Sequence, residues 1–102
     1  MREARRQRTY VSGRMSGIER DVYLRRFSQA EELLKGEGYR VYNPSKWWFL
    51  KHVPYRFALA FDLFMMCFCD RVYMLNGWSQ SDGATAEHSF ARSTGMIVMY
   101  EK

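Results

Sequence analysis

The sequence predicts a single α/β domain built on a parallel sheet, and three observations support this fold class. The chain has 102 residues, which is the size of one domain. Short runs rich in β-branched and aromatic residues alternate with longer segments whose apolar residues recur at helical spacing. Glycines and Asn-containing turn pairs separate the two kinds of segment. This alternation is typical of parallel strands joined by crossover helices.

The first strand and the first helix are predicted from the N-terminal third of the chain. Residues 9–12 form the strand, which ends at Gly13. Ser16 and Glu19 have the spacing of a capping box, so we expect the helix to begin there. One face of this helix carries apolar residues at positions i, i+4, i+7 and i+11, namely Tyr23, Phe27, Ala30 and Leu34.

The middle of the chain contains a second strand and a second helix. The strand spans residues 39–42 and ends at the pair Asn43-Pro44, and residues 45–56 are expected to be irregular. Residues 57–69 form a helix that is apolar on nearly every face, so we expect it to be buried on two sides.

The C-terminal part repeats the pattern. Residues 71–75 form a third strand, a helix runs from Ser81 to about Ser93, and residues 96–100 form the last strand. The order β-α-β-α-β-α-β predicts a small three-layer domain of the flavodoxin or Rossmann type, with a parallel sheet of four or five strands. Such sheets bind ligands outside the carboxyl ends of their strands.

Charge and composition narrow the function classes. The formal net charge is +5, and residues 1–8 hold four arginines against one glutamate. We expect these residues to be a disordered basic arm and residues 9–102 to be the folded domain. The arm together with Trp47 and Trp48 could contact nucleic acid, but a solvated terminus is the favoured interpretation, so a nucleic-acid partner is not expected.

Cysteine usage and hydropathy indicate a cytoplasmic protein. Cys67 and Cys69 are the only cysteines, and no further Cys or His pair has metal-binding spacing. Free thiols in a reducing compartment are therefore expected, with no metal and no cofactor. The longest apolar stretch, residues 57–69, is interrupted by Asp62 and is too short to span a membrane.

Three groups of polar residues should meet at the carboxyl edge of the sheet. The loop after the first strand offers Ser12, Gly13, Arg14, Ser16 and Gly17, whose backbone and helix start favour an anion. The alternative for this loop is a plain turn in which Ser16 caps the helix.

The other two groups carry the acidic residues. Ser81 and Gly83 open the third helix, and Glu87 lies near its second turn. Asp62 lies within a strongly apolar helix, where a charge is costly unless it is paired or belongs to a site. The alternatives are that Ser81 is only a helix cap, and that Glu87 and Asp62 face water. Two carboxylates, a helix start suited to phosphate and Tyr10 on the first strand fit glycosidic chemistry.

Three segments of the chain resemble one known superfamily. Residues 10–17 (YVSGRMSG), 38–44 (GYRVYNP) and 69–87 (CDRVYMLNGWSQSDGATAE) are similar to short bacterial and phage domains of the nucleoside 2-deoxyribosyltransferase-like superfamily. The resemblance covers roughly residues 9–100, and its most specific part is the run from Gly77 to Glu87. Characterised relatives are nucleoside 2-deoxyribosyltransferases and 2′-deoxynucleoside 5′-phosphate N-hydrolases.

The resemblance implies a role for individual residues. Glu87 corresponds to the nucleophilic glutamate, Asp62 to the aspartate that assists at the base and sugar, and Tyr10 to the tyrosine that orients the glutamate. Ser81 corresponds to the serine that contacts the substrate phosphate, and Gly13 with its loop to the phosphate or sugar loop. Arg14 departs from the pattern, because proline is more usual there. Larger relatives add a fifth strand after the fourth one expected here, and a tail that completes a neighbour's site in the transferases, so transferase activity is the less expected of the two.

These implications lead to a ranked set of functions. The leading hypothesis is hydrolysis of the N-glycosidic bond of a (deoxy)nucleoside 5′-monophosphate through a glutamate nucleophile. The alternatives are nucleoside 2-deoxyribosyl transfer and nucleotide binding without turnover. A short chain with an apolar central helix also favours a homodimer or larger homo-oligomer. The sequence does not specify the base or the sugar.

Overall fold

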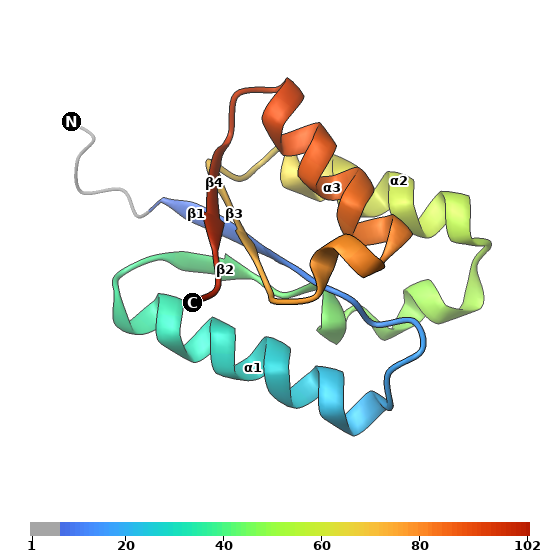
Figure 1. Ribbon diagram of the computed structural model, residues 1–102. Coiled ribbons are helices and arrows are strands. Elements are labelled where there is room, and N and C mark those ends of the chain that lie inside the picture. The colour runs from blue at the N-terminus through green and yellow to red at the C-terminus, as the bar shows by residue number, and fades with distance from the viewer. Residues whose placement is uncertain (1–6) are drawn as a thin grey trace.

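The computed structural model describes residues 7–102 and contains one four-stranded parallel sheet. The strands are β1 (Arg8–Ser12), β2 (Arg40–Tyr42), β3 (Arg71–Met74) and β4 (Ile97–Tyr100), in the spatial order β2-β1-β3-β4. All three pairings are parallel, so the carboxyl ends of the strands lie at one edge of the sheet (Figure 1). The predicted fold class is confirmed, with four strands.

Helices cover both faces of the sheet and complete a three-layer Rossmann-like arrangement. Helix α1 (Arg20–Gly36) lies on one face, and α2 (Tyr55–Met66) and α3 (Asp82–Ser93) lie on the other (Figure 1). Two short 3-10 helices, Pro44–Lys46 and Trp48–His52, connect β2 to α2.

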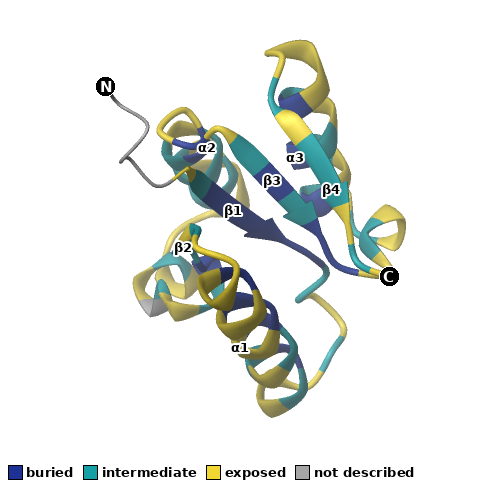
Figure 2. Ribbon diagram, turned by 90° about the vertical axis from the view of Figure 1, so that its left-hand side faces the viewer, coloured by how far each residue is buried: buried dark blue, intermediate teal, exposed yellow. Residues whose placement is uncertain are grey.

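The alternation of side chains along β1 divides the core into two halves. Tyr10 packs with Met66, Val72 and residues of α3, whereas Val11 packs with the inner face of α1. The predicted α1 face of Tyr23, Phe27, Ala30 and Leu34 is buried, which confirms the helical spacing. Figure 2 shows the buried residues concentrated on the central strands and on the helix faces that turn toward them.

The predicted start of the first helix is wrong. Helix α1 begins at Arg20, and Glu19 occupies the N-cap position without a side-chain cap bond. The Ile18 amide donates to the Met15 carbonyl and Gly17 has φ of +80°, so these residues form a turn before the helix. Ser16 is therefore left in the loop and does not cap α1.

The region from residue 45 to residue 69 also differs from its prediction. Residues 45–56 are mostly helical, because two 3-10 turns precede α2 and α2 begins directly after Pro54. Helix α2 ends at Met66, where tighter turns lead the chain toward β3. The sequence predicts that this helix is buried on two sides. Within a single chain that prediction is wrong, because Met66 is the one residue of α2 that is fully buried.

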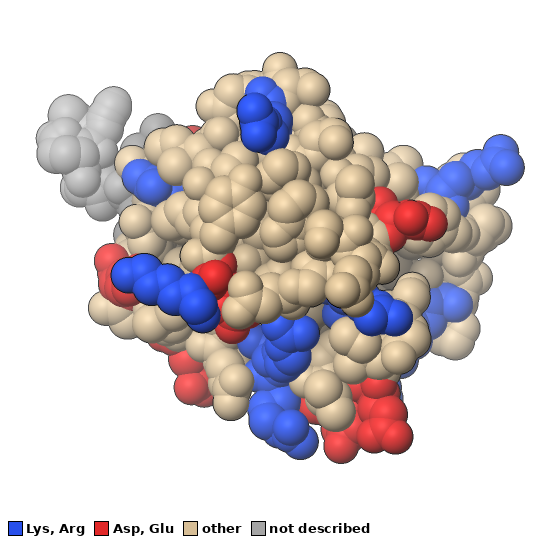
Figure 3. All heavy atoms as spheres, in the orientation of Figure 1, with Lys and Arg blue, Asp and Glu red and all other residues tan. Residues whose placement is uncertain are grey.

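The termini of the domain are close to where they were expected. β1 begins at Arg8, which the sequence placed in the basic arm, and the expected disorder of residues 1–6 concerns residues outside the described part of the chain. Within residues 7–102, no helix is long and apolar enough to cross a membrane. Over α1, Figure 3 shows charges of both signs interspersed, not a uniformly basic face.

Candidate functional site

A cavity of about 580 Å³ opens at the carboxyl edge of the sheet. Its walls come from the loop after β1, the start of α3, Tyr55 and Asp62 of α2, and Pro44. The strand register explains this location, because Ser12 pairs with Met74 and Met74 with Tyr100, so the segments after β1 and β3 leave the sheet side by side.

Glu87 lies at the floor of this cavity. Its side chain extends from the second turn of α3 and is only 6% exposed. The Tyr10 hydroxyl donates to Oε2 at 3.0 Å, and the Ser12 hydroxyl donates to Oε1 at 2.5 Å. Both donors are buried on β1, so the sheet fixes the orientation of the carboxyl group. The solvated alternative for Glu87 does not hold in this structure.

Asp62 lines the same cavity from α2 and interacts with Glu87. Its Oδ1 atom is buried and, within residues 7–102, has no hydrogen-bond partner. An unpartnered buried acceptor is rare in proteins and is often found where a ligand or a proton supplies the missing bond. The alternative in which Asp62 faces open water therefore does not hold either.

The two carboxyl groups shift each other's protonation. Burial and the nearby Asp62 charge together raise the pKa of Glu87 to about 8, against the hydrogen bonds from Ser12 and Tyr10. Burial also raises the pKa of Asp62, to about 6, against the hydrogen bond with Glu87. The pair consequently holds one proton near neutral pH. The higher pKa places this proton mainly on Glu87, and the hydrogen bonds from Ser12 and Tyr10 favour the minor form in which Glu87 is the anion and Asp62 carries the proton.

The start of α3 forms the wall beside Glu87. Ser81 is the N-cap residue, and its Oγ accepts a hydrogen bond from the Ala84 amide at 3.2 Å. The interpretation of Ser81 as a helix cap is thus confirmed, while its hydroxyl proton stays available to a ligand. Asp82 is exposed at the cavity rim, and Gly83 lines the cavity.

The loop after β1 forms the opposite wall. A Cβ on Gly13 would lie 2.9 Å from Leu75 Cδ1, so this glycine allows the loop to pack on the end of β3. Arg14 folds back and donates from Nε to the Ser16 carbonyl at 3.0 Å. Gly13, Arg14, Ser16 and Gly17 all line the cavity, but Ser12 does not. Ser12 contacts Glu87 instead, so its predicted place in the substrate-binding loop changes to a position behind the carboxylate.

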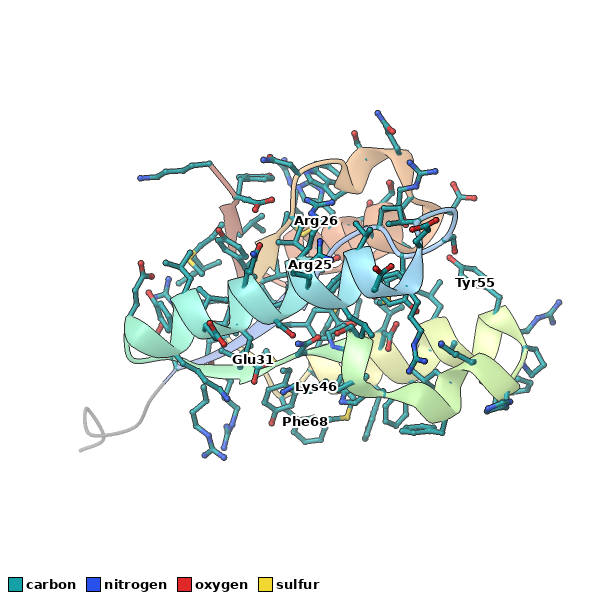
Figure 4. All side chains as sticks on the ribbon, turned by 90° about the horizontal axis from the view of Figure 1, so that it is seen from below. Arg25, Arg26, Glu31, Lys46, Tyr55 and Phe68 are labelled. Carbon is teal, nitrogen blue, oxygen red and sulfur yellow. The ribbon has the colours of Figure 1, made fainter. Side chains whose placement is uncertain are left out.

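Tyr55 was not predicted from the sequence. It begins α2 and projects toward the first turn of α3 (Figure 4), and its hydroxyl would lie 3.2 Å from a Cβ on Gly83. Burial raises the pKa of this hydroxyl, and the charges of Asp82, Glu87 and Asp62 raise it further. The sequence pattern did not indicate a role for Tyr55, because this residue lies in the stretch that was expected to be irregular.

A second buried acid, Glu31 on α1, was also missed. Its carboxylate accepts from Asn43 Nδ2 at 2.9 Å and pairs with Lys35 at 2.8 Å and Lys46 at 3.0 Å (Figure 4). Asn43 Oδ1 in turn accepts from the Ser45 amide and hydroxyl. This network holds the turn that carries Pro44, a residue of the cavity wall.

Residues 7–102 contain no group of three or more His, Cys, Asp or Glu side chains placed to hold a metal ion. The free thiols are the exposed Cys67 and the buried Cys69. Burial and, to a smaller extent, the Asp70 charge raise the pKa of Cys69 to about 12, so Cys69 is an unreactive core thiol.

Comparison with known proteins identifies a family without an assigned activity. The sequence model of the family described as Domain of unknown function (DUF4406) matches residues 7–100. The chain therefore belongs to this family. No curated protein matches the chain, and no solved structure matches it either.

Proposed function

We propose that this member of the DUF4406 family hydrolyses the N-glycosidic bond of a (deoxy)nucleoside 5′-monophosphate. The observation that carries the proposal is the pair of buried Glu87 and half-buried Asp62 at the floor of an open cavity, with two hydroxyls of β1 fixing Glu87. Two interacting carboxyl groups that share one proton supply a nucleophile and an acid to the same bond.

In the first step the Glu87 carboxylate attacks C1′ of the sugar. The bond from C1′ to the base nitrogen breaks, its electron pair goes to the base, and the base takes the proton from Asp62. The product is an ester between the sugar and Glu87. Tyr10 and Ser12 hold the carboxylate in line and contribute hydrogen bonds that orient it.

In the second step water attacks C1′ of the ester. Asp62, now ionised, takes the proton from that water, the C1′–O bond to Glu87 breaks, and the sugar phosphate leaves. The pair returns to its starting state with one proton. If another base attacks C1′ in place of water, the same ester gives deoxyribosyl transfer.

The start of α3 supports the choice of a phosphorylated substrate. The first amides of a helix lack intrahelical partners and carry a partial positive charge. Ser81 and Gly83 place this end on the cavity, and Arg14 lines the other wall. A 5′-phosphate at this point would gain charge-assisted hydrogen bonds.

The test is incubation with a panel of deoxynucleoside 5′-monophosphates, followed by chromatography of the products. We expect free base and deoxyribose 5-phosphate in equal amounts. Base release that requires a second, acceptor base would favour transfer. Tight binding without any base release would favour a nucleotide-binding module and contradict the proposed hydrolysis.

Ser81 offers a separate test of the phosphate subsite. Ser81→Ala and Ser81→Gly both remove the hydroxyl, but glycine is the better helix N-cap. We expect both variants to bind monophosphates roughly ten- to a hundredfold more weakly and to leave nucleoside binding nearly unchanged. Calorimetric titration measures both ligands, and equal affinity of the wild-type protein for nucleoside and monophosphate would argue against the subsite.

We also expect the protein to form a homodimer or larger homo-oligomer. The outer side of α2 and the segment after it leave Phe57, Phe64 and Phe68 about half or more exposed, and Phe68 points away from the domain (Figure 4). Large exposed apolar patches are uncommon on monomers. Light scattering at high concentration checks this, and a mass equal to that of one chain would contradict it.

A further inference from the structure

A second cavity, of about 300 Å³, adjoins the first one. It lies between the loop after β1, the two 3-10 helices and the inner side of α2. Four residues line both cavities, Met15, Ser16, Pro44 and Asp62. The two cavities are thus neighbouring compartments that meet at Asp62.

The walls of the second cavity are suited to a flat apolar group. Among the residues that line it, Trp47, Leu50, Tyr23 and Ala58 supply apolar surface. The Trp47 ring is held in place, because it contacts the Tyr10 ring at a centroid distance of 6.1 Å and meets the Phe61 ring edge-on at 5.5 Å. An aromatic wall whose orientation is fixed binds another aromatic ring at little entropic cost.

The junction of the two cavities carries the polar group that a ligand would satisfy. The buried Asp62 Oδ1 has no partner in residues 7–102. A ligand that extends from the first cavity into the second passes this atom. A nucleotide whose sugar lies over Glu87 would bring its glycosidic bond to this junction.

A lysine at the rim of the second cavity would favour one kind of nucleobase over another. Lys51 is exposed there, and no ion pair engages its ammonium group within residues 7–102. An ammonium group offers only donors, so it favours a ring with an acceptor at its outer edge. A carbonyl oxygen is the usual acceptor of this kind on a nucleobase.

We infer that the second cavity binds the nucleobase, and that Lys51 at its rim makes a base with a carbonyl oxygen the preferred one. This inference rests on the proposed function, since it assigns the sugar phosphate to the first cavity. It assigns the choice of base to residues of the segment between β2 and α2.

The first experiment tests whether the base occupies the second cavity. Titrations use Glu87→Gln protein, so that no ligand is consumed, with 2′-deoxyinosine 5′-monophosphate and with base-free 2-deoxyribose 5-phosphate. We expect the nucleotide to bind roughly ten- to a hundredfold more tightly, because stacking of the base adds affinity. Ala58→Leu should abolish this advantage and leave the binding of the sugar phosphate unchanged. Ala60→Leu, on the exposed side of the same helix, is the matched control.

The outcomes separate this inference from the proposed function. If the nucleotide keeps its advantage in Ala58→Leu, the second cavity does not hold the base, although the proposed reaction stands. If Glu87→Gln protein with an intact Ala58 binds neither ligand, the proposed function and this inference are overturned together. Tryptophan fluorescence adds an independent readout, since nucleotide binding should quench the emission and Trp47→Phe should reduce the quenching.

The second experiment tests Lys51. The 5′-monophosphates of 2′-deoxyinosine and 2′-deoxyadenosine differ in carrying a carbonyl or an amino group at the same ring position. We expect wild-type kcat/KM to favour the inosine nucleotide by about tenfold, the value of one hydrogen bond to a charged group. Lys51→Met should bring the ratio close to one. A ratio that is unchanged in Lys51→Met would overturn the role given to Lys51.

Discussion

Two buried glutamates on this fold have opposite surroundings. Glu31 and Glu87 are 7% and 6% exposed. Burial raises the pKa of Glu31, but the hydrogen bonds from Lys35, Asn43 and Lys46 outweigh it and lower the value to about 2. At Glu87 burial and the charge of Asp62 raise the pKa to about 8, because the opposing hydrogen bonds come from two neutral hydroxyls.

The difference separates a structural acid from a chemical one. The charge of Glu31 is compensated by two lysines, and its partners hold the turn between β2 and α2. No cation of residues 7–102 is among the groups that shift the pKa of Glu87, and its carboxyl group faces a cavity. Burial of an acid without a cation is unfavourable for folding, and such arrangements are concentrated at functional sites.

The largest expected difference between the two glutamates is the loss of activity when each is changed to glutamine. Glu87→Gln removes the nucleophile with little change in shape, and base release should fall by several powers of ten. Glu31→Gln should retain activity within about tenfold, because it loosens the wall at Pro44 without touching the reacting atoms. Glu32→Gln, at an exposed position on the same helix, is the control.

Base-release rates of all three variants give the comparison. Wild-type rates in Glu87→Gln would exclude Glu87 as the nucleophile. A loss in Glu31→Gln as large as that in Glu87→Gln would instead mean that the Glu31 network belongs to the reaction itself.

The pH profile should report the Glu87 pair and not Glu31. The active form has one proton shared by Asp62 and Glu87, so kcat/KM should be greatest between about pH 6 and pH 8. Below this window both groups are protonated and the nucleophile is lost, while above it both are ionised and the acid is lost. Activity should change by about tenfold per pH unit on each side.

A matched variant sharpens this prediction. Asp62→Asn removes one of the two titrations, so its residual activity should show a single ionisation in place of a bell. Glu31→Gln should leave the midpoints of the wild-type profile unchanged. A flat wild-type profile between pH 5 and pH 9 would contradict the shared-proton pair.

Local patterns in the sequence were sufficient for the fold and for part of the site. The spacing from Tyr23 to Leu34 predicts the buried face of α1, and the alternation of strands and helices predicts the parallel sheet. Parallel strands bring their carboxyl ends together whatever the details of the loops, which is why Tyr10, Asp62 and Glu87 could be expected at one edge.

The remaining features depend on contacts between distant residues. Glu31 has Lys35 four residues later, a spacing that is typical of an exposed helical ion pair. Its burial results from Asn43 and Lys46, which the turn after β2 brings back over α1. The place of Ser12 behind Glu87, and that of Tyr55 over Gly83, likewise depend on how α2 and α3 pack on the sheet.

Stability should respond to the two glutamates with opposite signs, and this is the smallest of the expected effects. The folded pKa of Glu87 lies above the ordinary value of 4.5, so its contribution to stability is fully present below about pH 4.5 and is lost as the pH rises through about 8. Glu87→Gln replaces the titrating carboxyl group by a neutral amide, so the variant does not lose this stability as the pH rises. Above pH 8 the variant should therefore be more stable than the wild-type protein, by about 1 kcal/mol or more.

Glu31 should behave in the reverse way. Its folded pKa of about 2 lies below the ordinary value, so its contribution is present above about pH 4.5 and is lost as the pH falls toward 2. Lys35 and Lys46 have side chains that are 59% exposed, so solvent screens these pairs, and Glu31→Gln should cost about 1 kcal/mol at pH 7. Urea unfolding at pH 5 and pH 8.5 measures both variants against the wild-type protein. If Glu87→Gln lowered the free energy of unfolding at pH 8.5 as Glu31→Gln does, Glu87 would be a stabilising core acid and the contrast between the two sites would fail.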